Sequence, residues 1–230
     1  MPRRRRHYLR WVILGLAILI VLGVGGPLVY IHLIEGPAPA PLALPKTNAA
    51  PRKATSTTFD GTWTVGKGSV AGYRVQEVLV GQNTTAVGRT TSVTGSIVIA
   101  NGEVSSGSFT VDLATVKSNE GARDVQFRGR IMDTSMYPDA IFTLTKAIDL
   151  GPSPELNKTF TASATGSLTM HGVTRSVRFS VSARDSGSLF EVVGSIPVVF
   201  ANWNIANPSF AGFVTVENHG LVEFSLDLRR

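Results

Sequence analysis

Apolar and polar side chains alternate with a period of two along most of the chain after Phe59. Residues 222–228, for example, read VEFSLDL, and residues 174–184 and 160–170 show the same alternation. Because successive side chains of a β-strand point to opposite faces of a sheet, each segment predicts a strand with one buried and one polar face. This pattern limits the chain to folds that are built mainly from half-buried strands.

Turn dipeptides divide the alternating part of the chain into segments. Asn101-Gly102, Ser106-Gly107, His171-Gly172 and Ser186-Gly187 are typical of tight turns between strands. Residues 117–136 are charged and aperiodic, which predicts a short helix and a loop. Strands are expected near 63–65, 70–80, 84–90, 93–100, 106–113, 140–149, 160–170 and 174–184, with more near 189–200 and 213–229. Strands at this spacing predict an antiparallel sheet that closes into a barrel or folds into a sandwich.

The segment from Trp11 to Ile34 is apolar and contains no Asp, Glu, Lys or Arg. A helix of this length would extend about 36 Å, which is enough to cross a hydrocarbon layer of about 30 Å. A buried helix of a soluble domain is the alternative, but such helices are rarely so long and uniformly apolar. We therefore expect residues 11–34 to form a transmembrane helix.

The charges on either side of this segment predict its orientation. Five arginines lie within residues 1–10, whereas Glu35 is the only charged residue between the segment and Lys46. The positive-inside rule then places the N-terminus in the cytoplasm and the C-terminal domain outside the cell membrane. A cleaved signal peptide is the alternative. The apolar run is too long for a typical signal peptide, and Pro41 follows the nearest A-x-A sequence, Ala38 to Ala40.

Residues 35–58 contain five prolines and no aromatic residue, so they cannot form a core. This composition is typical of a semi-rigid spacer, which at ~3.1 Å per residue would reach up to about 75 Å. The predicted organisation is a basic cytoplasmic segment over 1–10, a membrane helix over 11–34, a linker over 35–58 and a single β-domain over 59–230.

The net charge of +6 comes almost entirely from the N-terminal segment. Residues 1–10 hold five of the 22 basic residues and none of the 16 acidic ones, so the rest of the chain is close to neutral. A protein that binds nucleic acid is therefore not expected. The chain has no cysteine, which excludes disulfides, a lipidated cysteine and cysteine-ligated metals.

Sequence signatures of enzymes are also missing. There is no G-x-S-x-G and no H-E-x-x-H motif, and the β-domain has only His171 and His219 as histidines. We expect no catalysis, no metal and no cofactor. An enzyme that acts on a lipid through His171 and nearby acids is a third hypothesis.

Three strings resemble the YceI-like family. They are Arg123-Asp124, then Met136-Tyr137-Pro138 followed by Phe142, and the string GSLTMHGVTR over residues 166–175. Trp63 and the closing strand over 220–228 also stand where the family has an aromatic residue and a last strand. The resemblance covers roughly residues 62–229. It departs from the family near Trp203, where Asn202 and Asn204 stand in place of a charged neighbour.

This resemblance implies a lipocalin-like antiparallel barrel with an elongated apolar cavity for a polyisoprenoid or similar amphiphilic lipid. Arg123, Asp124 and His171 are then candidates to meet the head group of the lipid. The full set of expected ligand-binding residues is Arg123, Asp124, Phe127, Phe142, Leu168, Met170, His171 and Phe179.

The residue pattern itself leaves open whether the barrel holds a ligand or is filled by its own side chains. The small inward residues Ala162, Ala164 and Gly166 favour a cavity. The alternative function is a structural or adhesive domain of the cell envelope with a filled barrel. His171-Gly172 can equally be a simple hairpin turn, and Arg123-Asp124 a surface pair.

Overall fold

The strands of this protein form one antiparallel barrel. The structure is a computed structural model that describes residues 11–16, 18, 37–53, 59–79, 81–151, 155–210 and 214–230. The main strands are β2 (Gly61–Val65), β3 (Val70–Leu79), β4 (Gln82–Thr90), β5 (Val93–Ala100), β6 (Glu103–Asp112), β7 (Asp139–Leu144), β10 (Phe160–Met170), β11 (Val173–Asp185), β12 (Phe190–Val199) and β14 (His219–Arg229). Short strands are β1 (Arg52–Lys53), β8 (Ile148–Asp149), β9 (Glu155–Leu156) and β13 (Val214–Val216).

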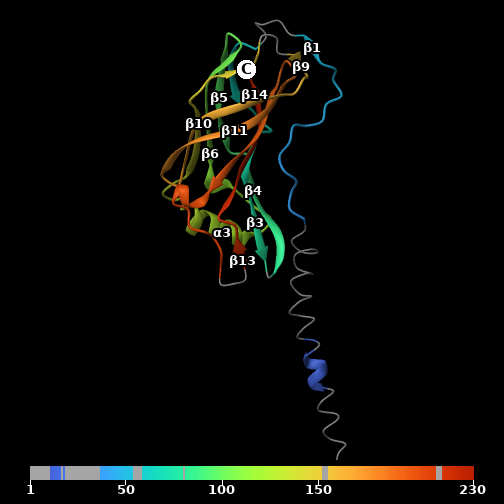
Figure 1. Cartoon of the computed structure of the whole chain (residues 1–230), viewed down its shortest axis with the longest axis vertical. Coiled ribbons are helices and arrows are strands. Elements are labelled where there is room, and N and C mark those ends of the chain that lie inside the picture. Colours follow the sequence, from blue (N-terminus) through green and yellow to red (C-terminus); the bar gives the residue numbers. More distant parts are fainter. Residues whose placement is uncertain are drawn as a thin grey trace, which may run out of the picture.

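Strand β14 closes the barrel because it pairs along both of its edges. One edge pairs with β12, from Phe190↔Leu228 to Val199↔His219, and the other pairs with β2 and β3. The closed ring runs β2-β5-β6-β7-β10-β11-β12-β14, which makes eight strands. Strands β3, β4 and β13 continue the wall at one end of this ring (Figure 1). The prediction of an antiparallel sheet is confirmed, in its closed form.

Two of the predicted turns owe their geometry to positive φ angles. Asn101 and Gly102 have φ values of 55° and 78°, and His171 and Gly172 have 47° and 73°. These are the conformations that two-residue hairpins require. The prediction of a turn at Ser106-Gly107 is wrong: both residues lie within β6, opposite an irregularity between Val98 and Ile99 of β5.

The aperiodic segment forms a short helix across one end of the barrel. Helix α3 (Gly121–Gln126) begins after Glu120, whose carboxylate accepts a hydrogen bond from the N–H of Ala122. It continues into the π-helical turn η5 (Phe127–Ile131), from which Phe127 turns into the barrel and is buried. Two 3-10 turns, η4 (Leu113–Thr115) and η6 (Phe200–Trp203), lie at the ends of β6 and β12.

The interior contains two apolar clusters, one toward each end of the barrel. Trp63, Phe190 and Leu228 belong to the cluster at the end away from α3, and Trp63 donates a hydrogen bond of 2.9 Å from Nε1 to the carbonyl of Phe59. Phe127 and Trp203 belong to the cluster at the α3 end. The far end is packed more closely, with the rings of Trp63 and Phe190 in contact, and the larger open space lies at the α3 end.

The predicted membrane helix, residues 11–34, falls mainly outside the described residues. Residues 11–16 and 18 are helical, and the large side chains among them, such as Trp11 and Ile13, are exposed. Over the part of the chain that the structure describes, no helix has the length and apolar character needed to cross a membrane.

Residues 37–46 of the predicted spacer lie against the outer wall of the barrel. Figure 1 shows the segment running down one side of the molecule from β1 toward the end that carries α3 and β13. Carbonyl groups of Pro39 and Pro45 accept hydrogen bonds from Arg74 and Arg184 of the barrel, at 2.7 and 2.8 Å. These residues of the predicted semi-rigid spacer are in contact with the barrel, because the barrel offers guanidinium groups that bind the backbone of the segment.

Candidate functional site

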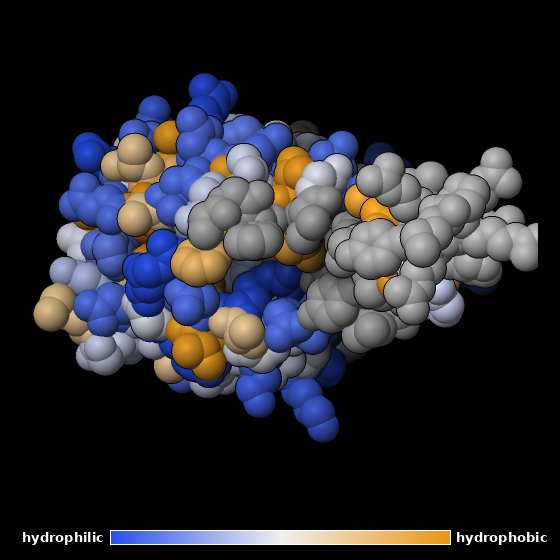
Figure 2. Space-filling view, turned by 90° about the horizontal axis from the view of Figure 1, so that it is seen from below, coloured by the Kyte–Doolittle hydropathy of each residue, from blue (hydrophilic) through white to orange (hydrophobic). Residues whose placement is uncertain are grey.

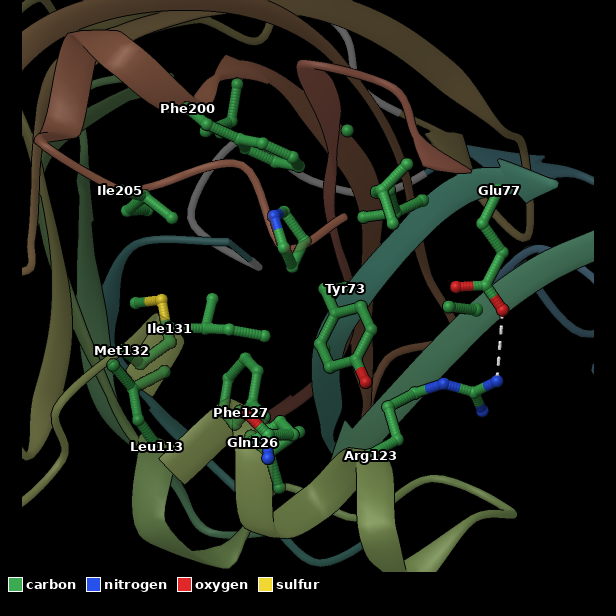
Figure 3. A pocket seen from close by; sticks show the side chains of 18 of the residues that line it. Tyr73, Glu77, Leu113, Arg123, Gln126, Phe127, Ile131, Met132, Phe200 and Ile205 are labelled. Atoms are coloured by element: carbon green, nitrogen blue, oxygen red, sulfur yellow. Dashed lines mark hydrogen bonds and ion pairs between the residues drawn. The ribbon is translucent and has the colours of Figure 1, made fainter. Parts of the chain in front are cut away.

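A cavity of about 590 Å³ occupies the end of the barrel that α3 and η5 cover. Strand β3 forms one side of it, and helix α3, turn η5 and the segment after β12 form the others (Figure 3). Pockets of 300–1,000 Å³ are typical of sites for small organic ligands. Most of the lining is apolar: Ala71, Val75, Leu79, Ala86, Val111, Leu113, Val116, Phe127, Ile131, Met132, Ala140, Met170, Val198, Phe200, Ile205, Phe210, Val214, Val216, Leu221 and Val222.

Polar side chains gather on one side of this cavity. Nη2 of Arg123 lies 3.1 Å from Oε1 of Glu77 (Figure 3). Nη1 of Arg123 donates to Oδ1 of Asn119 at 2.8 Å. The side chains of Arg123 and Glu77 are only 17% and 8% exposed. A largely buried ion pair therefore stands at the edge of an apolar chamber, where the low dielectric strengthens its hydrogen bonds.

Tyr73 projects from β3 into the same chamber and stacks on Phe127, with ring centroids 5.0 Å apart. Burial raises the pKa of Tyr73 to about 12, although the neighbouring positive charge of Arg123 acts in the opposite direction. The hydroxyl of Tyr73 therefore keeps its proton at neutral pH and can donate a hydrogen bond to a ligand. Its surroundings are ordered by Asp124, which accepts hydrogen bonds from the N–H and the hydroxyl of Ser118 at 2.8 and 2.7 Å.

A second cavity, of about 120 Å³, continues along the barrel axis. It adjoins the first, because Ala71, Val111, Ala140 and Val222 line both. Every residue that lines the second cavity is apolar. The aromatic rings of Phe142, Phe179 and Phe224 stand around it in edge-on contacts, with centroids 5.4 and 5.9 Å apart. The interior is thus a hollow that narrows from the α3 end toward the packed rings.

The larger cavity opens between α3 with η5 on one side and Pro208 and Phe210 on the other. Gln126, Arg130 and Phe210 line the cavity and are exposed. Nη2 of Arg130 donates to the carbonyl of Pro208 at 3.2 Å and so bridges the two sides. Figure 2 looks onto this end and shows a hollow with hydrophobic and hydrophilic residues interspersed around it.

The structure divides the eight expected ligand-binding residues among three places. Arg123, Phe127 and Met170 line the larger cavity. Phe142, Leu168 and Phe179 line the smaller one. Asp124 and His171 line neither of the two cavities.

His171 occupies the turn between β10 and β11, with φ at 47°. Its Nδ1 is 3.2 Å from the carbonyl oxygen of Trp203, and its ring packs edge-on against Tyr137 at 4.9 Å. Trp203 in turn donates from Nε1 to the carbonyl of Leu168 at 3.3 Å. These contacts give the motif residues around His171 a structural role, which is to join the hairpin to η6.

Tyr73 and Glu77 were not among the expected site residues. Both point inward from β3, along with Ala71, Val75 and Leu79. The sequence did contain a signal, because an acidic residue at position 77 shares the spacing of apolar residues on a half-buried strand. A buried carboxylate needs a partner, and Arg123 was the partner that could not be assigned from the sequence.

Gly166 does not contribute open space to the cavity. A Cβ at this position would overlap with the ring of Phe142 and with the carbonyl of Thr143. The glycine thus makes room for an aromatic side chain of the neighbouring strand. Ala162 and Ala164, in contrast, do line the smaller cavity.

Among the residues that the structure describes, no group of three or more His, Cys, Asp or Glu side chains is placed to hold a metal ion. The charged groups of the cavity are instead two acidic and two basic residues, Glu77, Glu120, Arg123 and Arg130. The arrangement offers hydrogen bonds and an apolar enclosure.

A closed eight-stranded antiparallel barrel with an apolar cavity under a short helix defines a lipocalin-like protein. The YceI-like domain matches residues 56–228, so the chain belongs to the YceI-like family. Among curated proteins, none matches the sequence significantly.

Two solved structures share the fold. A polyisoprenoid binding domain from Saccharophagus degradans, implicated in plant cell wall breakdown, is 15% identical, with a TM-score of 0.58 over 73% of this chain and 97% of that chain. BcnA from Burkholderia cenocepacia is 20% identical, with a TM-score of 0.52 over 67% of this chain and 95% of that chain. At these identities the likeness is one of fold.

Proposed function

We propose that this protein is a membrane-anchored extracytoplasmic module that binds a polyisoprenoid or another long amphiphilic lipid, without catalysis. The observation that carries the proposal is the pair of adjoining apolar cavities along the barrel, with polar side chains gathered toward the open end. The shape fits a molecule with a long apolar chain and a small head group. The polyisoprenoid-binding domain from Saccharophagus degradans, which has the same fold, supports this class of ligand.

The apolar wall alone does not explain selectivity. Burying about twenty carbons at ~0.8 kcal/mol per CH₂ would yield about 16 kcal/mol relative to water. A lipid in a bilayer already has nearly the same transfer free energy, so its movement into the barrel gains little from apolar contacts. Net affinity therefore depends on the shape of the hollow and on the head group.

The head group is expected to meet Tyr73, Glu77 and Arg123. Because the acidic and basic side chains of the cavity balance, the site favours a head group that forms hydrogen bonds over one with several charges. Prenyl alcohols and prenyl quinones have such head groups. The tether supports the function by raising the local concentration of membrane lipids near the cavity.

The test is mass spectrometry of lipids extracted from the purified protein. We expect a prenyl lipid or a similar chain in the native protein, and its loss in Ala140→Phe, since Ala140 lines both cavities and a phenyl ring there would fill space at their boundary. Ser180→Phe, on the exposed face of β11, is the matched control and should keep the lipid. Thermal melts of both variants separate loss of binding from loss of folding.

An empty native protein that also fails to take up added prenyl alcohols and quinones would contradict the proposal. The alternative function, a structural domain of the cell envelope, would then be favoured. The packed rings of Phe142, Phe179 and Phe224 would support it.

The anchor is tested separately, by adding protease to intact cells. Five arginines before an apolar segment of 24 residues predict that protease removes the barrel and leaves a small N-terminal fragment in the membrane. A mature protein that begins within residues 35–50 and is washed from membranes by carbonate would contradict the anchor.

A further inference from the structure

Residues 37–46 form a strap, by which we mean the extended segment that lies along the outer wall of the barrel. Ala38, Leu42 and Leu44 are half-buried, while the residues between them are exposed. Four of the ten residues are prolines, which hold the chain extended and leave the carbonyl groups as the main hydrogen-bonding sites. A segment of this kind binds where a surface presents donors.

One group of such donors surrounds Glu223 on β14. Glu223 is 3% exposed, and its carboxylate accepts hydrogen bonds from Nε of Arg74 at 3.1 Å and from Nη2 of Arg89 at 2.8 Å. Each arginine donates a further hydrogen bond to the strap, Arg74 to the carbonyl of Pro39 and Arg89 to that of Ala40. The carboxylate holds both guanidinium groups in place, and the strap satisfies their outward N–H groups.

A second group of donors lies further along the wall. Arg184 and Glu191 are opposite each other on β11 and β12, and Nη2 of Arg184 also donates to the carbonyl of Pro45 at 2.8 Å. Both clusters lie under the strap on the face that the strand pattern marks as polar. Two ion clusters at matching positions make this part of the outer wall a specific seat for the strap.

The N-terminal end of the strap lies at the cavity end of the barrel. Arg74 stands between Tyr73 and Val75, which line the larger cavity, and Glu223 follows Val222, which also lines it. Figure 1 shows the strap running from β1 toward the end that carries α3 and β13. The strap therefore runs toward the mouth of the cavity.

The length of chain before the strap limits how far the apolar segment can extend from the mouth. Pro39 stands five positions after Ile34, the last residue of the apolar segment, so the two can be at most about 17 Å apart. On β3, Leu79 near the mouth stands five positions after Arg74, a distance of about 16 Å. The end of a membrane helix over 11–34 is thus kept within reach of the level of the mouth, and far short of the ~75 Å of a free spacer.

The mouth has the composition of a surface that lies on lipid. Phe210 is 64% exposed and lines the opening, and Val125 on α3 is 60% exposed. Arg130, which also lines the cavity and donates to the carbonyl of Pro208, adds a cationic group at this end. Aromatic and apolar side chains beside arginine suit the interface of an anionic bilayer.

We infer that the strap holds the mouth of the cavity against the bilayer from which the chain emerges, so that a lipid passes between membrane and cavity without crossing water. This inference rests on the proposed membrane anchor. It names the bilayer surface as the partner of the face that contains Phe210 and Val125.

The test uses the full chain in vesicles of phosphatidylethanolamine and phosphatidylglycerol that carry a nitroxide-labelled lipid. The absence of cysteine allows single labels, so Val125→Cys at the mouth and Ser188→Cys in the β11–β12 turn at the far end each take one fluorophore. The lipid should quench the label at position 125 and leave the one at 188 unaffected.

Two insertions of the same twenty-residue Gly/Ser sequence distinguish a strap from a spacer. Placed between Glu35 and Gly36, the insertion lengthens the chain before the strap and should abolish quenching at position 125. Placed between Ala54 and Thr55, after the strap, it should leave quenching unchanged. A free spacer would respond equally to both insertions, and this result would overturn the inference.

Two further outcomes would each contradict the inference that the mouth lies on the bilayer. Equal quenching at positions 125 and 188 in vesicles to which the protein is anchored would refute the contact between the mouth and the bilayer. The proposed anchor would still stand. A protein that does not float with the vesicles at all would refute the anchor and, with it, this inference. Lipid extraction reports on cargo independently of either result.

Discussion

Arg184 and Glu191 face each other directly across β11 and β12 and form an ion pair with 2.7 Å between Nη2 and Oε2. Their side chains are 7% and 10% exposed, so the pair is buried although it lies on the polar face of the sheet. Residues 37–46 provide the cover, through the hydrogen bond from Arg184 to the carbonyl of Pro45. Where the strap crosses the barrel, polar side chains on the outer face are therefore buried.

Replacing one partner of this pair should be costly. Arg184→Met leaves the carboxylate of Glu191 buried without its partner, and we expect a loss of about 3–5 kcal/mol in the free energy of unfolding. The double variant Arg184→Met/Glu191→Leu should recover most of this loss. Urea denaturation measures both. Lys158→Met, at the exposed pair with Glu155, is the control and should change stability by about 1 kcal/mol or less. Equal losses of stability in Arg184→Met and Lys158→Met would contradict the burial of the Arg184–Glu191 pair.

Gly166→Ala should destabilise the barrel by about 1–3 kcal/mol, because the added Cβ overlaps with the ring of Phe142 in a packed core. Gly129→Ala is the matched control, since no atom lies within 4 Å of a Cβ built at position 129. It should be neutral or slightly stabilising. The measurement is the midpoint of thermal unfolding for the two variants, and a Gly166→Ala protein as stable as the native one would contradict the packing described.

Phe179→Ala should enlarge the smaller cavity as well as weaken the core. Phe179 is 7% exposed and contacts the rings of Phe142 and Phe224. We expect a loss of about 3–5 kcal/mol in stability. If the hollow holds a chain, the extracted lipids should shift toward longer chains, as measured by mass spectrometry. Unchanged chain lengths in a folded variant would argue against the smaller cavity as the end of the binding site.

The raised pKa of Tyr73 predicts that the free energy of unfolding falls at high pH. Burial raises its pKa from 10.0 to about 12 in the folded protein, so the folded state holds the phenolic proton more tightly than the unfolded state. The contribution of this group is fully present below pH 10 and is lost as the pH rises from about 10 to about 12. A shift of two pKa units corresponds to about 2.7 kcal/mol.

Tyr73→Phe should remove this part of the pH dependence. Urea denaturation of native protein and variant between pH 8 and 11 should give curves that diverge only above about pH 10. Tyr137→Phe serves as the control and should retain the full fall in stability. A parallel decline of the native protein and Tyr73→Phe would show that Tyr73 ionises normally.

The strands and most turns could be predicted from the sequence because they depend on local patterns. Alternation over residues 222–228 and 174–184 identifies strands wherever one face is buried. His171 illustrates the limit of motif reading. Its string belongs to the family pattern, but the side chain serves the hairpin and the contact with Trp203. Membership of a motif identifies the fold and leaves the role of each side chain open.

What the sequence by itself determined is the set of half-buried strands, the absence of disulfides, the family and the apolar N-terminal segment, since each is a property of neighbouring residues or of composition. The cavity, the Glu77–Arg123 pair and the seat of the strap were decided only by the tertiary structure. Arg74 and Glu223 are 149 positions apart, and they meet because β14 pairs with β3 in one register. Strand alternation specifies which face a side chain takes, whereas the register between distant strands decides which side chains on that face meet.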